Sequence, residues 1–113
     1  MRGDPAPSRA RILIVAGEVS GDIHAGNLLE ALRAVSPGIE AFGIGGERLE
    51  RAGLDCIART EQLAHMGLVE VARELPRLRA ILRSVVGAAK QRAPQVAVLV
   101  DSPDFNLRLA ARL

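Results

Sequence analysis

The chain has 113 residues, of which 49% are hydrophobic, 25% charged and only 2% aromatic, and its net charge is +2. The plentiful apolar residues and nearly balanced charge exclude a disordered chain, and the size fits one globular domain or part of one. The single Cys56 cannot close an intrachain disulfide, the two Phe offer no stacking platform for nucleic acid, and no apolar stretch is long enough to span a membrane.

The first predicted elements are a strand and a helix. Residues 1–10 lack the apolar core of a signal peptide and are expected to form a loose tail. Ile12–Ala16 is a short apolar, β-branched run that predicts a strand buried on both faces. A helix then follows, with Ser20 or Asp22 as its predicted N-cap and Pro37 after its end. Its apolar residues recur at helical spacing: Ala25, Leu28, Leu29, Leu32 and Val35.

Two further strands and two helices are predicted in the middle of the chain. Glu40–Ile44 is expected to be a strand, and a short helix over Glu47–Ala52 should end at Gly53, a residue type typical of helix ends. Leu54–Ala58 predicts a third short strand. Met66–Glu74 can form a helix.

The last third of the chain predicts a long amphipathic helix and a fourth strand. Pro76 is expected at the first position of the helix or at a kink, and Pro94 follows the helix. The apolar residues of this helix lie at i, i+3, i+4, i+7, i+8 and i+11: Leu78, Ile81, Leu82, Val85, Val86 and Ala89. Val96–Val100 is a fully apolar strand, and Phe105–Leu113 begins another helix without a stop signal, so we expect an N-terminal piece of a longer protein.

Alternating strands and helices predict an α/β fold with a doubly wound, Rossmann-like parallel sheet of about four strands. In such sheets ligands bind beyond the carboxyl ends of the strands. Three segments there are distinctive, namely Gly17–Asp22, Gly43–Gly46 and Asp101–Asn106. The first segment satisfies neither the dinucleotide fingerprint nor the P-loop pattern. The negative charge of Glu18 would repel a pyrophosphate. A carboxylate at this position is better suited to accept a hydrogen bond from a sugar hydroxyl or to act as a base.

Asp101 is the strongest candidate for chemistry. It directly follows five apolar residues, and partial desolvation at the mouth of a sheet favours a carboxylate that acts as a general base. Asp104 either contributes to the site or caps the next helix, and Asn106 either orients a ligand or lies in the first helical turn. His24 and His65 have no Cys, Asp or Glu neighbours at ligand spacing, so no metal is expected.

The region 66–83 interleaves apolar residues with arginines. Two interpretations remain open. Either this is an ordinary amphipathic helix packed on the sheet, or its surplus apolar residues face lipid while the arginines pair with anionic head groups. On the second interpretation the membrane-facing residues are Val69, Leu75, Leu78 and Leu82.

Four motifs converge on one family. VAGEVSGDIHAG, FGIGGERL, HMGLVEV and DSPDFNLRLA occur in the order and spacing of bacterial lipid-A-disaccharide synthases, and the chain resembles them from about residue 11 to its end. Small departures are Leu49, where Met is common, and His65, where a small apolar residue is usual. The resemblance implies a two-domain GT-B glycosyltransferase, with residues 11–113 as an incomplete, acceptor-side N-terminal domain and the C-terminal nucleotide-sugar domain absent from this sequence.

The resemblance also implies a reaction and a place in the cell. An inverting transfer would join UDP-2,3-diacylglucosamine to 2,3-diacylglucosamine 1-phosphate, giving lipid A disaccharide 1-phosphate and UDP without a cofactor, on the cytoplasmic face of the inner membrane. Asp101 would be the base. Glu18, Ser20 and Gly21 would line the cleft, with Gly17 and Gly45 keeping the backbone close to the ligand. The isolated fragment is expected to be inactive.

Two alternative hypotheses assign the chain to other classes of protein. A non-catalytic Rossmann-like module would bind a sugar phosphate or a nucleotide. A dinucleotide-dependent oxidoreductase is disfavoured because the glycine fingerprint is missing.

Overall fold

The computed structural model describes residues 10–63, 75–100 and 109–113. It contains a four-stranded sheet in the order β3-β2-β1-β4, and every neighbouring pair is parallel. The strands are β1 (Arg11–Ala16), β2 (Glu40–Gly45), β3 (Asp55–Arg59) and β4 (Val96–Val100). The prediction of an α/β, Rossmann-like parallel sheet is therefore confirmed.

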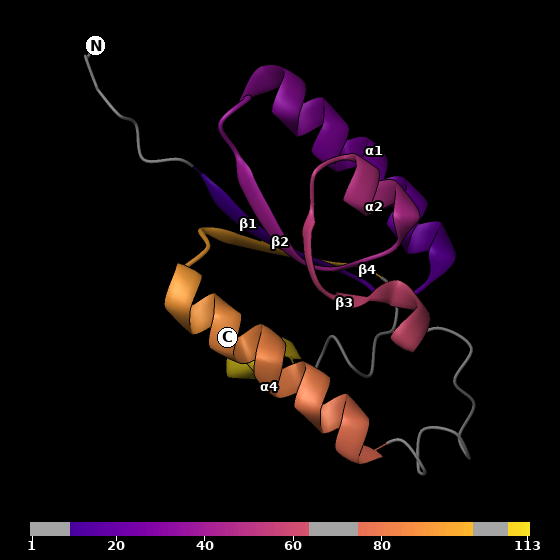
Figure 1. Ribbon diagram of the computed structural model, residues 1–113. Coiled ribbons are helices and arrows are strands. Elements are labelled where there is room, and N and C mark those ends of the chain that lie inside the picture. Colours follow the sequence, from indigo (N-terminus) through magenta and orange to yellow (C-terminus); the bar gives the residue numbers. More distant parts are fainter. Residues whose placement is uncertain (1–9, 64–74, 101–108) are drawn as a thin grey trace.

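Helices cover both faces of this sheet (Figure 1). The helices α1 (Val19–Val35) and α2 (Glu47–Arg51) lie on one face, and α4 (Leu75–Arg92) lies on the other. A 3-10 turn, η1 (Thr60–Gln62), follows β3. Residues 109–112 are helical, which agrees with the predicted last helix as far as it is described. The predicted helix Met66–Glu74 lies outside the described residues.

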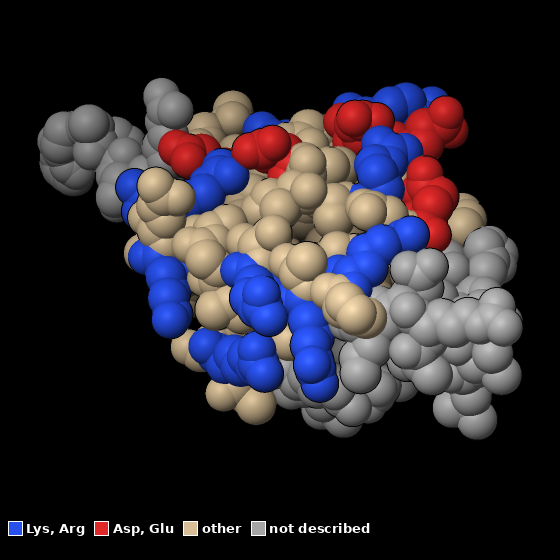
Figure 2. Space-filling view, turned by 60° about the horizontal axis from the view of Figure 1, so that its bottom comes forward, with Lys and Arg blue, Asp and Glu red and all other residues tan. Residues whose placement is uncertain are grey.

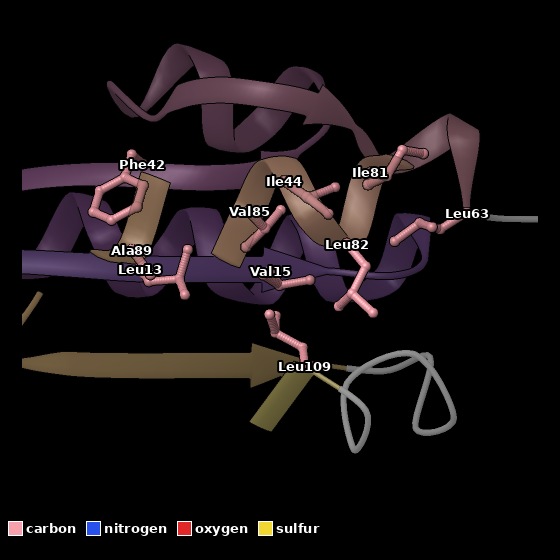
Figure 3. Close-up of a cluster of buried hydrophobic side chains, with 10 residues drawn as sticks. All are labelled: Leu13, Val15, Phe42, Ile44, Leu63, Ile81, Leu82, Val85, Ala89 and Leu109. Atoms are coloured by element: carbon pink, nitrogen blue, oxygen red, sulfur yellow. The ribbon is translucent and has the colours of Figure 1, made fainter. Parts of the chain in front are cut away.

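Alternation along the strands divides the core into two layers, because successive side chains of a strand point to opposite faces. Leu13 and Val15 of β1 join the layer under α4, whereas Ile12 and Ile14 join the layer under α1. Figure 3 shows the first layer, which ten buried side chains form: Leu13, Val15, Phe42, Ile44, Leu63, Ile81, Leu82, Val85, Ala89 and Leu109. Because both faces of the sheet are buried, successive residues of β1 are apolar and form one continuous run in the sequence.

Two predictions about boundaries need correction. Neither Ser20 nor Asp22 is the N-cap of α1, because the helix starts at Val19 and Glu18 occupies the cap position without a side-chain cap bond. Ala10, expected in the loose tail, accepts the Glu40 N–H at 2.8 Å and thereby extends the β1–β2 pairing. Pro76 lies in the first turn of α4, as predicted, where its missing N–H breaks no helical hydrogen bond.

Cys56 packs half-buried against the layer under α1. Burial raises the pKa of its thiol above the ordinary value, and the negative charge of Glu50 acts in the same direction. Cys56 is therefore held as a neutral thiol, the unreactive form.

Gly43 is the residue of the sheet that most needs to be glycine. Its φ of +145° accompanies a register shift between β2 and β3, and a Cβ there would clash with the carbonyl oxygen of Ile14. Gly87, on the outer side of α4, has no atom within 4 Å of the Cβ it would gain.

We expect Gly43→Ala to lower the free energy of unfolding by about 1–3 kcal/mol from backbone strain alone. The matched control, Gly87→Ala, should raise it by about 0.5–1 kcal/mol, because alanine favours a helix interior. Urea unfolding of the two variants measures both effects. Equal stabilities for the two variants would contradict this account of the sheet.

Candidate functional site

The candidate site lies at the edge where all four parallel strands have their carboxyl ends. Three connections leave the sheet there within the described residues: the loop from β1 to α1, the loop from β2 to α2, and η1 after β3. The N–H of Gly17 donates to the carbonyl of Val100 at 2.9 Å, so the start of the first loop touches the end of β4. Asp101 follows Val100 directly in the sequence.

The β1–α1 loop displays its polar side chains to solvent. Glu18 and Ser20 are exposed, whereas Gly17 and Gly21 are buried beneath them. The backbone of Glu18 is extended, and its carbonyl accepts the N–H of Asp22 at 3.0 Å. The Glu18 carboxylate is thus presented at the start of α1, where a carboxylate is stabilised by the helix dipole and stays available to a ligand.

Asp22 joins the two loops. Its carboxylate is buried and accepts three backbone N–H groups, from Gly46 at 2.7 Å, Arg48 at 2.9 Å and Leu49 at 3.0 Å. These are N–H groups at the start of α2 that have no partner within the helix, so Asp22 caps a helix 24 residues further along the chain rather than its own. The positive end of the α2 dipole stabilises the buried charge.

Glycines allow this close approach. A Cβ at Gly46 would lie 2.8 Å from the nearer carboxylate oxygen of Asp22, and one at Gly45 would lie 2.7 Å from Leu54 and 2.8 Å from Leu49. The predicted role of Gly45, holding the backbone near a ligand, is not tested, and packing alone already requires a glycine there. The absence of a side chain at Gly45 therefore lets Leu49 and Leu54 pack closely against this edge of the sheet.

Arg48 and Thr60 strengthen the same edge. Arg48 donates to Asn27 at 2.9 Å and to Glu30 at 3.1 Å, so a second contact ties α2 to α1. The buried hydroxyl of Thr60 donates to the carbonyl of Ala16 at 3.0 Å and ties η1 to the end of β1. Side chains thus link the segments that follow β1, β2 and β3 into one frame.

The remaining predicted site residues divide into two groups. Asp101, Asp104, Asn106 and Val69, together with the Leu75 side chain, lie outside the described residues. Leu82 is 5% exposed in the core under α4, and Leu78 packs against that core half-buried. The prediction that Leu82 faces a membrane is therefore wrong, because its side chain covers the sheet.

The described residues offer no cluster of three or more His, Cys, Asp or Glu that could hold a metal ion. Over the same ranges, no helix is long and apolar enough to cross a membrane.

Sequence reasoning missed the joining role of Asp22 and the contacts of Arg48 and Thr60. Each of these bonds spans at least 18 residues of chain, and no periodic pattern reports such a pairing. For Asp22 the sequence carries a usable signal. An acidic residue lies in the first turn of α1 and a Gly-Gly pair precedes α2, and these two helices follow the neighbouring strands β1 and β2.

Residues 12–113 match the family model described as lipid-A-disaccharide synthetase. Curated lipid-A-disaccharide synthases from Anaeromyxobacter sp. (strain K) and Myxococcus xanthus (strain DK1622) are 55% and 50% identical to it over 103 residues. The enzyme of that name from Azotobacter vinelandii is 43% identical over 103 residues. Each alignment covers 91% of this chain and 27% of the relative, so the chain spans about a quarter of their length.

Removal of the Asp22 carboxylate should weaken the whole edge. We expect Asp22→Ala to lower the free energy of unfolding by about 2–4 kcal/mol, because three buried N–H groups lose a charged acceptor. The control is Glu30→Ala, which removes an exposed carboxylate from Arg48 and should cost less than about 1 kcal/mol. Thermal and urea unfolding compare the two variants. A loss for Asp22→Ala no larger than that of the control would refute the joining role.

Proposed function

This chain belongs to the lipid-A-disaccharide synthase family, and from that premise we propose that the full-length protein is an inverting glycosyltransferase of lipid A biosynthesis. By full-length protein we mean the polypeptide encoded by the whole reading frame that contains residues 1–113. It joins UDP-2,3-diacylglucosamine to 2,3-diacylglucosamine 1-phosphate and yields the β-1′,6-linked lipid A disaccharide 1-phosphate and UDP. The observation that carries this proposal is the 55% identity to a curated synthase across 103 residues.

Residues 11–113 form the acceptor side of a GT-B enzyme in this proposal. The linked loops after β1 and β2 provide one wall of the cleft, with Glu18 and Ser20 exposed on it. A second Rossmann-like domain, outside this sequence, holds the nucleotide sugar and faces the same edge. Active sites of open parallel sheets lie at this edge in general, which supports the assignment.

The chemistry is a displacement at the anomeric carbon. Asp101 takes the proton from the 6-hydroxyl of the acceptor, and the oxygen attacks the anomeric carbon of the UDP-sugar. The bond to UDP breaks on the opposite side, UDP leaves with the electron pair, and the configuration inverts. Glu18 accepts hydrogen bonds from sugar hydroxyls and orients the acceptor. Rigid loops matter because small displacements of a bound hydroxyl reduce the rate strongly.

The full-length protein acts at the cytoplasmic surface of the inner membrane in this proposal, and α4 supplies its basic contact. The apolar stripe of α4 is committed to the core, so its outer side is the surface open to a partner. Arg79, Arg83 and Lys90 lie at i, i+4 and i+11, which places them on one line, and α4 contains no acidic residue. Figure 2 shows Lys and Arg gathered on this face. Such a surface suits anionic lipid head groups.

Replacement of the base should abolish transfer without loss of the fold. We expect Asp101→Asn in the full-length protein to lower kcat by about 100-fold or more, the typical contribution of general-base catalysis. Product formation from the two lipid substrates, followed by mass spectrometry, measures it. Glu30→Gln, on the outer side of α1, serves as control and should retain the full rate. A rate for Asp101→Asn within threefold of wild type, at an unchanged melting temperature, would remove Asp101 from this role.

Neutralisation of the α4 surface should release the full-length protein from anionic membranes. Arg79→Gln, Arg83→Gln and Lys90→Gln together should lower partitioning onto phosphatidylglycerol vesicles by roughly a hundredfold, at about 1 kcal/mol for each charge. Arg51→Gln, exposed on α2, is the matched control for loss of positive charge and should have little effect. Vesicle sedimentation at low salt compares these variants. Unchanged partitioning of the triple variant would show that α4 is not the contact.

A further inference from the structure

Glu18 lies between two ties of the β1–α1 loop. On its amino-terminal side, the N–H of Gly17 donates to the carbonyl of Val100 at 2.9 Å. On its carboxyl-terminal side, the N–H of Asp22 donates to the carbonyl of Glu18 itself at 3.0 Å. The carboxylate of Asp22 in turn accepts three N–H groups at the start of α2. The position of Glu18 therefore depends on the contact between Asp22 and α2.

The cap of α2 comes from outside that helix. Gly46 occupies the N-cap position with a φ of −108°, a value that does not require glycine. A serine at an N-cap commonly accepts the N–H of the second or third helical residue through its own hydroxyl. In this protein those residues are Arg48 and Leu49, and their N–H groups donate to Asp22 instead, at 2.9 and 3.0 Å.

The distant cap and a local cap exclude each other. A Cβ at Gly46 would lie 2.8 Å from Oδ2 of Asp22, so the carboxylate occupies the space that a capping side chain would need. Burial of a carboxylate costs free energy that a local hydroxyl cap would avoid. Stabilisation of α2 alone therefore does not account for Asp22. What Asp22 adds, and a local cap does not, is a link from α2 to the first turn of α1.

We propose that Asp22 is a positioning residue of the transfer reaction, which holds Glu18 where its carboxylate orients the acceptor sugar; this role rests on the proposed function. Asp22 itself is buried, and its two carboxylate oxygens are bonded to N–H groups of α2, so it acts through Glu18 and not on the substrate. Loss of the link shifts Glu18, and a small shift of an orienting group lowers the rate strongly.

A variant of the full-length protein that replaces the distant cap by a local one tests this role. Asp22→Ala combined with Gly46→Ser removes the carboxylate, makes room for the new Cβ and lets the serine hydroxyl cap α2. We expect this variant to melt at a higher temperature than Asp22→Ala alone. Its kcat/KM for the acceptor should nevertheless stay at least about tenfold below that of wild type.

Two controls separate positioning from stability. The KM for the UDP-sugar should stay within about twofold of wild type in the same variant, because the second domain holds the nucleotide sugar in the proposed function. Glu30→Ala removes a different contact between α1 and α2, the one with Arg48, and should keep the wild-type rate. Recovery of kcat/KM for the acceptor together with the melting temperature would show that Asp22 only stabilises α2, and would overturn the positioning role.

A second measurement tests whether Asp22 acts through Glu18. Asp22→Asn keeps the shape of the side chain and one oxygen for two of the three N–H groups, but turns an NH₂ donor towards the N–H of Arg48. Glu18→Gln should lower kcat/KM for the acceptor less in this background than in wild type, because the orientation is already lost.

The outcomes distinguish the positioning role from the proposed function. Losses from Asp22→Asn and Glu18→Gln that simply multiply, in an active enzyme, would show that the two residues act independently and would overturn the positioning role alone. A wild-type full-length protein that forms no disaccharide would overturn the proposed function, and the positioning role with it.

Discussion

The buried carboxylate of Asp22 is the interaction on which the candidate site depends. One side chain on the first turn of α1 satisfies three N–H groups at the start of α2, and so fixes the loop after β1 against the loop after β2. The bond between Thr60 and Ala16 extends this frame to β3, and that between Gly17 and Val100 extends it to β4. The carboxyl edge is therefore organised by the protein itself before any ligand binds.

The two faces of α4 differ in burial and charge. Leu82 and Val85 complete the core beneath the sheet, and this leaves Arg79, Arg83 and Lys90 on the outer side. The proposed membrane contact therefore rests on charge rather than on the apolar stripe. Burial of the stripe stabilises the fold, and a basic surface binds anionic lipid in a reversible, salt-dependent manner.

The sequence predicted the elements well because strands buried on both faces and a long amphipathic helix leave strong local patterns. Ile12–Ala16 and Val96–Val100 were recognised almost to the residue. The partners of Arg48 and Thr60 were not predictable, since each bond depends on how distant turns meet in space. Leu82 was misassigned because an apolar stripe has the same spacing whether a sheet or a lipid layer covers it. The predicted roles of Asp101, Asp104 and Asn106 stay predictions.

The central claim is that this chain provides the acceptor side of a lipid-A-disaccharide synthase. The most direct measurement is incubation of the wild-type full-length protein with UDP-2,3-diacylglucosamine and 2,3-diacylglucosamine 1-phosphate, with UDP and the lipid product quantified together. The account predicts one UDP released for each disaccharide formed, with a β linkage. Binding of the two substrates without transfer would contradict it and would favour a non-catalytic sugar-phosphate-binding module.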